Sequence, residues 1–111
     1  MMSKRDEKLL IADILEAINK IERYLLEMSY ETFIKDEKTI DAVIRNFEII
    51  GEAANQIPED FIEKHHEIPW RDLSDFRNVL IHAYFGVDLR MVWQIFELHL
   101  PLLEKQLSEI K

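Results

Sequence analysis

Hydrophobic residues along the chain recur at intervals of three and four, the spacing of one face of an α-helix, and no segment alternates like a strand. The first such stripe occupies positions 10, 14, 18, 21, 25 and 28, while Glu, Lys and Arg populate the other faces. We therefore predict a long amphipathic helix over about residues 4–28, whose apolar face packs in a helical core.

A second stripe predicts a helix from about Glu37 to Gln56, after a connector over residues 30–36. Gly51 lies on its apolar face, where a glycine costs about 1 kcal/mol relative to alanine, so we expect another helix to approach closely there. Asn46, at the border of that face, is expected to be buried and hydrogen-bonded. Charged residues on the opposite face predict a solvated surface or, alternatively, a partner-docking surface: Asp41, Arg45, Glu48 and Glu52.

Prolines and a glycine divide the second half of the chain. Pro58 is expected to begin a short helical segment that ends before Pro69, because residues preceding a proline avoid the helical conformation. A third long helix is predicted from about residue 72 to residue 85, ending at Gly86.

The last helix is predicted to begin after Asp88, its N-cap, and to continue to about Ile110. Pro101 falls inside it, removes one backbone donor and crowds the preceding turn, so we expect a kink there. The whole pattern predicts an all-α fold formed by a single domain over residues 1–111. Its expected architecture is an antiparallel up-and-down bundle of four long helices plus a short one.

Composition narrows the class of protein. The chain has no cysteine, which excludes disulfides and thiolate metal sites. No long uncharged apolar run predicts a transmembrane helix, and the amphipathic N-terminus lacks the pattern of a signal peptide. We therefore expect a cytoplasmic protein without membrane contact.

The net charge of −8 argues against broad binding to duplex nucleic acid, which requires a basic surface. A small local phosphate site remains compatible with this charge, and so does a partner with a basic surface.

Candidate chemistry concentrates in the sequence RNVLIHAYFGVD, which begins at Arg77. On a continuous helix Arg77 and His82 lie roughly 140° apart around the axis, so they do not touch within one chain. Asn78 shares a face with His82, since four residues separate them. Tyr84, seven residues after Arg77, lies on the face of the arginine.

The residues between the arginine and the histidine also include an apolar run, 79–81, which predicts a largely buried helix. Charged groups beside such a run need partners, because burying an unpaired charge is costly. The residues alone leave two interpretations: a structural arginine paired with a carboxylate beside a hydrogen-bonded histidine, or a functional polar cluster.

Three segments together carry a resemblance to one family. The string RNVLIHAY is similar to the HEPN signature, in which a polar residue follows an arginine and a histidine comes some residues later. Its tyrosine, two residues after the histidine, is the HepT variant of that signature. RNFEIIGEAANQIP at residues 45–58 resembles the second helix of the family, and IPWRDLSDFRNVLIHAYFGVDLRMVW at residues 68–93 resembles its third and fourth helices. The chain thus resembles the HepT-type toxin ribonucleases of the HEPN superfamily over about residues 6–107.

The resemblance implies specific roles and partners. Arg77 and His82 would be catalytic, acting on an RNA phosphate without a metal or cofactor, with Asn78 in the supporting polar position. The motifs of two subunits would meet in the cleft of a homodimer. A minimal nucleotidyltransferase antitoxin would silence the toxin by adding AMP to Tyr84, as in a type VII-like toxin–antitoxin pair.

The residue types suit this chemistry. Histidine titrates near neutral pH and can accept the proton of a ribose 2′-hydroxyl, while the planar guanidinium of arginine stabilises charge on phosphate oxygens. A symmetric dimer brings together two copies of each group, so neither has to reach the other within one subunit. AMP at Tyr84 would add negative charge beside Arg77 and block an RNA phosphate.

Two other functions remain open from the sequence. One is a non-catalytic HEPN module that binds nucleotide or a partner within a nucleotidyltransferase complex. The other is a helical dimerisation domain without a small-molecule role. Growth arrest on expression alone favours the toxin, whereas tight nucleotide binding without RNA cleavage favours the binding module.

The remaining candidate residues are interpreted as structural. His65 and His66 point about 100° apart on a helix, so a metal site is not expected there. Trp70 and Trp93 are expected to anchor the core near the motif, with lining of the groove or of an interface as the alternative. His99 is expected to be either packed or exposed at the surface.

Overall fold

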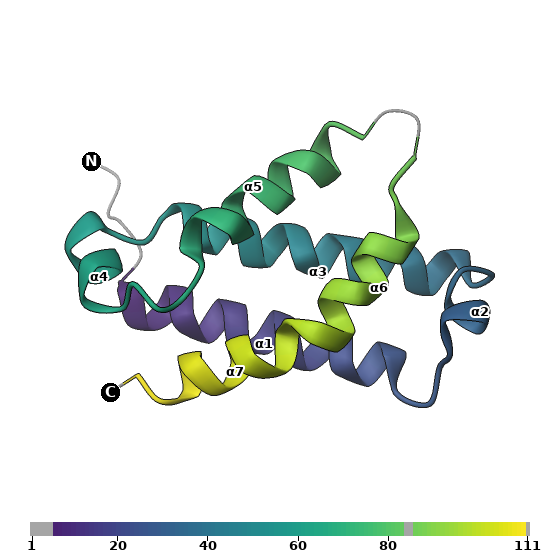
Figure 1. Cartoon of the computed structure of the whole chain (residues 1–111), viewed down its shortest axis with the longest axis horizontal. Coiled ribbons are helices and arrows are strands. Elements are labelled where there is room, and N and C mark those ends of the chain that lie inside the picture. The colour runs from purple at the N-terminus through teal and green to yellow at the C-terminus, as the bar shows by residue number, and fades with distance from the viewer. Residues whose placement is uncertain (1–5, 84–85, 111) are drawn as a thin grey trace.

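The computed structural model describes residues 6–83 and 86–110, and the described chain consists of helices joined by short connections (Figure 1). The prediction of an all-α bundle is therefore confirmed. The helices, in chain order, are α1 (Glu7–Leu25), α2 (Tyr30–Phe33), α3 (Glu37–Asn55), α4 (Glu59–Lys64), α5 (Trp70–Ile81), α6 (Leu89–Leu98) and α7 (Leu100–Ser108).

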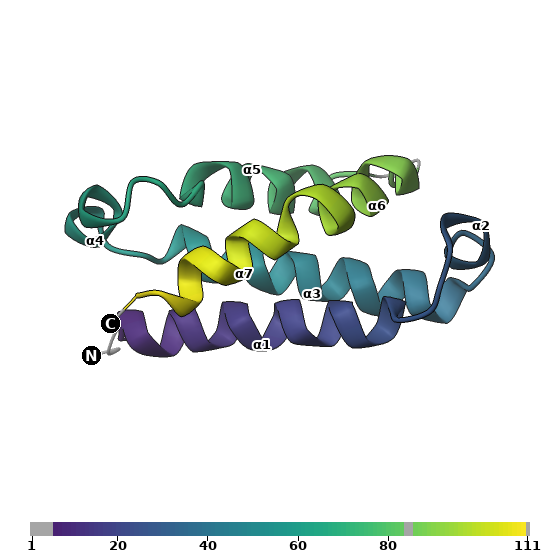
Figure 2. The ribbon, with the colours of Figure 1, turned by 60° about the horizontal axis from the view of Figure 1, so that its bottom comes forward.

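The long helices alternate in direction along the bundle. Helix α3 packs between α1 and α5, and α7 packs on α1. Figure 2 shows α1 along one side of the molecule, α5 and α6 along the opposite side, and α3 and α7 between them. Helix α1 begins and α7 ends at the same end of the bundle, while α5 tilts away from α3 toward the other end (Figure 1).

Capping residues set the bounds of α1 and α2. Asp6 caps α1 by accepting a hydrogen bond from the backbone N–H of Lys8, and Glu27 adopts a left-handed φ of 67° just after the helix ends. The predicted connector over residues 30–36 contains one turn of helix, α2, because Ser29 and Thr32 form a reciprocal capping box. The predicted start at residue 4 lies outside the described residues.

The predicted bounds of α5 are wrong. It begins directly after Pro69, earlier than residue 72, and it ends at Ile81 instead of residue 85. The chain has to turn back before Asp88, which caps α6 by accepting hydrogen bonds from the backbone N–H groups of Arg90 and Met91. Gly86, which precedes α6, has a φ of 111°, a conformation that favours glycine.

The expected burial of the apolar run 79–81 is also wrong. Only Leu80 is buried, whereas Val79 and Ile81 are 51% and 45% exposed. The reason is that α5 packs on α3 with one face only, and the end of α5 leaves the bundle (Figure 1). Two large apolar side chains thus face solvent beside the motif.

The last helix is divided in two at His99, which is exposed. Pro101 lies in the first turn of α7, where a missing backbone N–H leaves no intrahelical bond unmade. The predicted kink is therefore present, as a one-residue interruption at His99 between α6 and α7.

The core consists mainly of aliphatic side chains from α1, α3 and α7, together with two tryptophans. Trp70 and Trp93 are 3% and 8% exposed, which confirms their role as anchors. The indole N–H of Trp70 donates to the carbonyl oxygen of His65, and Trp93 packs against Phe33. Among the described residues, no helix is both long and apolar enough to cross a membrane.

Candidate catalytic site where α5 packs on α3

Gly51 determines how closely α5 approaches α3. A Cβ atom at position 51 would lie 2.7 Å from the backbone oxygen of Leu73 and would overlap the Cβ of Arg77. Only a glycine leaves this space, so the expected close approach is confirmed. Arg77 is consequently seated directly on the backbone of α3.

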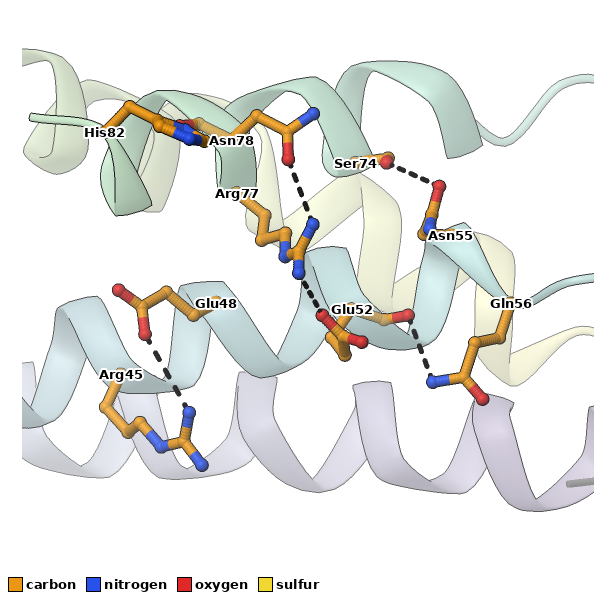
Figure 3. Close-up of polar contacts among 9 residues, drawn as sticks. All are labelled: Arg45, Glu48, Glu52, Asn55, Gln56, Ser74, Arg77, Asn78 and His82. Atoms are coloured by element: carbon orange, nitrogen blue, oxygen red, sulfur yellow. Dashed lines mark hydrogen bonds and ion pairs between the residues drawn. The ribbon is translucent and has the colours of Figure 1, made fainter.

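The guanidinium of Arg77 is held from two sides (Figure 3). Its Nη2 forms an ion pair with Oε2 of Glu52 at 2.6 Å, and its Nη1 donates to Oδ1 of Asn78 at 2.9 Å. The Arg77 side chain is 26% exposed, and its Nε is buried without a hydrogen-bond partner. The structural interpretation, an arginine paired with a carboxylate, is therefore correct for this contact.

His82 lies at the C-cap of α5 and is exposed. Its Nδ1 is 2.9 Å from the backbone carbonyl oxygen of Asn78. A carbonyl can only accept, so Nδ1 carries the proton of this bond and Nε2 is the basic nitrogen of the neutral ring. Asn78 thus contacts both other polar residues of the motif. Its side chain accepts from Arg77, and its backbone carbonyl accepts from His82 (Figure 3).

Tyr84 lies outside the described residues. The expectation that it shares a face with Arg77 assumed a helix that continues to residue 85. Since α5 ends at Ile81, helical geometry no longer gives the position of Tyr84. Its proposed role therefore rests on the sequence motif alone.

The contact of Glu52 with Arg77 was not predicted from the sequence. The charged face of α3 is largely solvated, as expected, and Arg45 pairs there with Glu48 at 3.8 Å (Figure 3). Glu52, which is 53% exposed, reaches across to α5. Gly51 could have indicated this contact in the sequence. A helix that approaches closely at a glycine also comes within reach of the next residue, here Glu52.

The motif borders a hollow of about 420 Å³, to which α1, α3 and α5 contribute residues, including Glu52, Arg77 and Ile81. Over residues 6–83 and 86–110, no group of three or more His, Asp or Glu side chains has the arrangement of a metal site. His65 packs against Phe61 with ring centroids 4.6 Å apart.

Comparison with known proteins identifies the family. The family model described as "Ribonuclease HepT-like" matches residues 14–110. The chain belongs to the HepT-like ribonuclease family. The predicted resemblance is thereby confirmed, and with it the class of enzyme to which the family belongs.

Two relatives of this HepT-like protein match over most of their own length. A protein of Thermococcus cleftensis named "Probable ribonuclease HepT" is 46% identical over 97% of this chain and 98% of its own. A protein of Methanocaldococcus jannaschii named "Putative RNase MJ0127" is 40% identical over 98% of this chain and 90% of its own. No solved structure matches the chain significantly.

Proposed function

We propose that this HepT-like protein is a toxin that cleaves RNA without a metal, using Arg77 and His82 of two subunits in one dimer cleft. The observation that carries the proposal is the arrangement around Asn78, whose backbone orients the imidazole and whose side chain holds the guanidinium. The family and its relatives named as ribonucleases support RNA as the substrate.

The proposed reaction uses the 2′-hydroxyl of the substrate as the nucleophile. Nε2 of His82 accepts the hydroxyl proton, the 2′-oxygen attacks phosphorus, and the bond from phosphorus to the 5′-oxygen breaks. The products are a 2′,3′-cyclic phosphate and a 5′-hydroxyl end, which takes up a proton. The guanidinium of Arg77 stabilises the negative charge that develops on the phosphate oxygens.

The proposed dimer rests on the exposed apolar side chains near the motif. Val79 and Ile81 lie in the last turn of α5 and are 51% and 45% exposed. Apolar surface of this kind is a common feature of interfaces between subunits. A two-fold contact at the end of α5 would bring two copies of His82 near two copies of Arg77.

The proposed partner is a minimal nucleotidyltransferase that transfers AMP to Tyr84. The support is the position of this tyrosine in the sequence, two residues after His82 in the family motif. The intact mass of the protein, measured after incubation with ATP and such a partner, should increase by one AMP unit. Tyr84→Phe should show no increase, and an equal increase in that variant would exclude Tyr84 as the acceptor.

The test of the nuclease is RNA cleavage by the purified protein in the presence of EDTA. We expect cleavage of a mixed RNA pool, and we expect His82→Ala to abolish cleavage without changing the melting temperature or the oligomeric state. His66→Ala is the matched control, because His66 is also exposed but lies outside the motif. Absence of cleavage by the wild type, or full activity of His82→Ala, would contradict the proposal.

One observation favours the alternative, a non-catalytic module within a nucleotidyltransferase complex. The charge of Arg77 is already neutralised by Glu52 in the structure. Under this alternative, the protein binds a nucleotide tightly and leaves RNA intact. Isothermal titration with AMP and ATP, carried out beside the cleavage assay, distinguishes the two functions.

A further inference from the structure

We infer that Glu52 is a positioning residue for Arg77: it fixes the guanidinium from the neighbouring helix so that its remaining N–H groups face an RNA phosphate. The inference rests on the proposed ribonuclease function and assigns a role to a residue outside the motif. The contact that carries it is the 2.6 Å ion pair between Glu52 of α3 and Arg77 of α5.

The backbone around Glu52 is arranged for this contact. Gly51 lets the Cβ of Arg77 rest against α3, and the next residue along α3 supplies the carboxylate that meets the guanidinium. The two adjacent residues therefore act together. Gly51 leaves space for the Cβ of Arg77, and Glu52 orients its guanidinium.

The hydrogen bonds leave donors available for a substrate. An arginine has five N–H groups, of which Nη1 and Nη2 carry two each. In the structure, Nη2 pairs with Glu52 and Nη1 donates to Asn78, which fixes the plane of the guanidinium. Each of these nitrogens keeps a second N–H that can bind a phosphate oxygen, while the buried Nε cannot reach one.

The exposure of the Glu52 carboxylate limits the contribution of the pair to stability. The Glu52 side chain is 53% exposed and the Arg77 side chain is 26% exposed, and ion pairs at a surface contribute little to the free energy of folding. Loss of the carboxylate should therefore leave the fold intact and release the guanidinium into several rotamers. Catalysis depends on the alignment of charged groups, so the rate of the chemical step should fall.

We predict that the loss of Glu52 changes kcat and KM in different ways. Glu52→Ala should lower kcat by roughly tenfold or more, because orientation is lost. Its KM should stay the same or fall, because a negative charge is removed from beside the RNA. Glu52→Gln keeps an oxygen acceptor for the guanidinium and should recover part of kcat.

Glu48→Ala is the matched control. Glu48 lies one turn earlier on the same helix and carries the same charge, but it pairs with Arg45 (Figure 3). Its removal should leave kcat within about twofold of the wild type, so the comparison separates positioning of Arg77 from a general change of charge.

The experiment measures cleavage of an end-labelled single-stranded RNA by the full chain, with melting temperatures as a check on folding. In parallel, ¹⁵N NMR spectra follow the Arg77 side chain, assigned by its loss in Arg77→Ala. We expect a restricted guanidinium in the wild type and in Glu48→Ala, and free rotation in Glu52→Ala. A kcat in Glu52→Ala equal to or above that of the wild type would overturn the inference.

The two proposals fail in different ways. If the wild type cleaves no RNA, the proposed nuclease is wrong, and the NMR spectra still decide whether Glu52 restrains Arg77. If the wild type cleaves and Arg77→Ala does not, but Glu52→Ala matches Glu48→Ala in both readouts, only the positioning role is wrong.

Discussion

At the scale of single residues, the position of Arg77 depends on the missing Cβ atom of Gly51. Gly51 has no Cβ, and the space it leaves is filled by the Cβ of Arg77 and the backbone of Leu73. The position of the guanidinium, and so its distance from Glu52, follows from this close approach. One glycine thereby connects the packing of two helices with the chemistry of the motif.

Gly51→Ala tests this connection, because the sign of the change in the free energy of unfolding depends on whether α5 presses against Gly51. In an unobstructed helix the change would stabilise the fold by about 1 kcal/mol. Here the added methyl group has to push α5 away, so we expect a destabilisation of about 1–3 kcal/mol in urea unfolding, together with weaker RNA cleavage. Stabilisation by this substitution would show that α5 does not press against Gly51.

At the scale of elements, helix bounds were predicted correctly where they depend on neighbouring residues and wrongly where they depend on the path of the chain. Asp88 is the N-cap of α6 as expected, because a cap depends on the next two or three residues. The buried Asn46 donates to the carbonyl oxygen of Ala42, which also follows from local spacing. The end of α5 depends instead on where the chain must turn to reach α6, and no local pattern gives that distance.

The contact between α1 and α7 contains a pair of like charges. Burial, followed by the charge of Glu104 and a hydrogen bond with it, raises the pKa of Glu22 from its ordinary value of 4.5. Because the folded state holds this proton more strongly than the unfolded state, protonation stabilises the fold. That stabilisation is present at low pH and is lost as the pH rises through the raised pKa.

Glu22→Gln should therefore raise the melting temperature at pH 7, because the neutral amide removes the repulsion. The gain should shrink as the pH falls through the raised pKa of Glu22 and vanish below 4.5, where the wild-type carboxyl is itself protonated. Melting curves between pH 3.5 and 8 measure this. Glu16→Gln, on the exposed side of α1, serves as the control, and an equal gain there would point to net charge instead of the pair.

At the scale of the whole molecule, the end of α5 stands out from the bundle and carries exposed apolar side chains (Figure 1). A strongly acidic chain with a net charge of −8 has little attraction for RNA in general. Two motifs brought together in a dimer would concentrate cationic groups in one place. We therefore expect activity to depend on assembly.

Val79→Asp tests this dependence. Val79 is 51% exposed, so the change should leave the subunit folded but should separate the dimer and abolish RNA cleavage. Light scattering after gel filtration measures the mass. Leu26→Asp is the control, since Leu26 is 72% exposed at the end of α1 and should tolerate a charge. A Val79→Asp variant that remains dimeric and active would place the interface elsewhere.

The helical class, the starts of α3, α4 and α6, the close approach at Gly51 and the motif around Arg77 could be predicted from the sequence alone. These features follow from periodicity and from interactions between residues a few positions apart. The pairing of Arg77 with Glu52, the end of α5 at Ile81 and the exposure of Val79 became visible only in the three-dimensional structure. The physical reason is that each of these depends on how separate helices meet in space, which the spacing of residues within one helix does not specify.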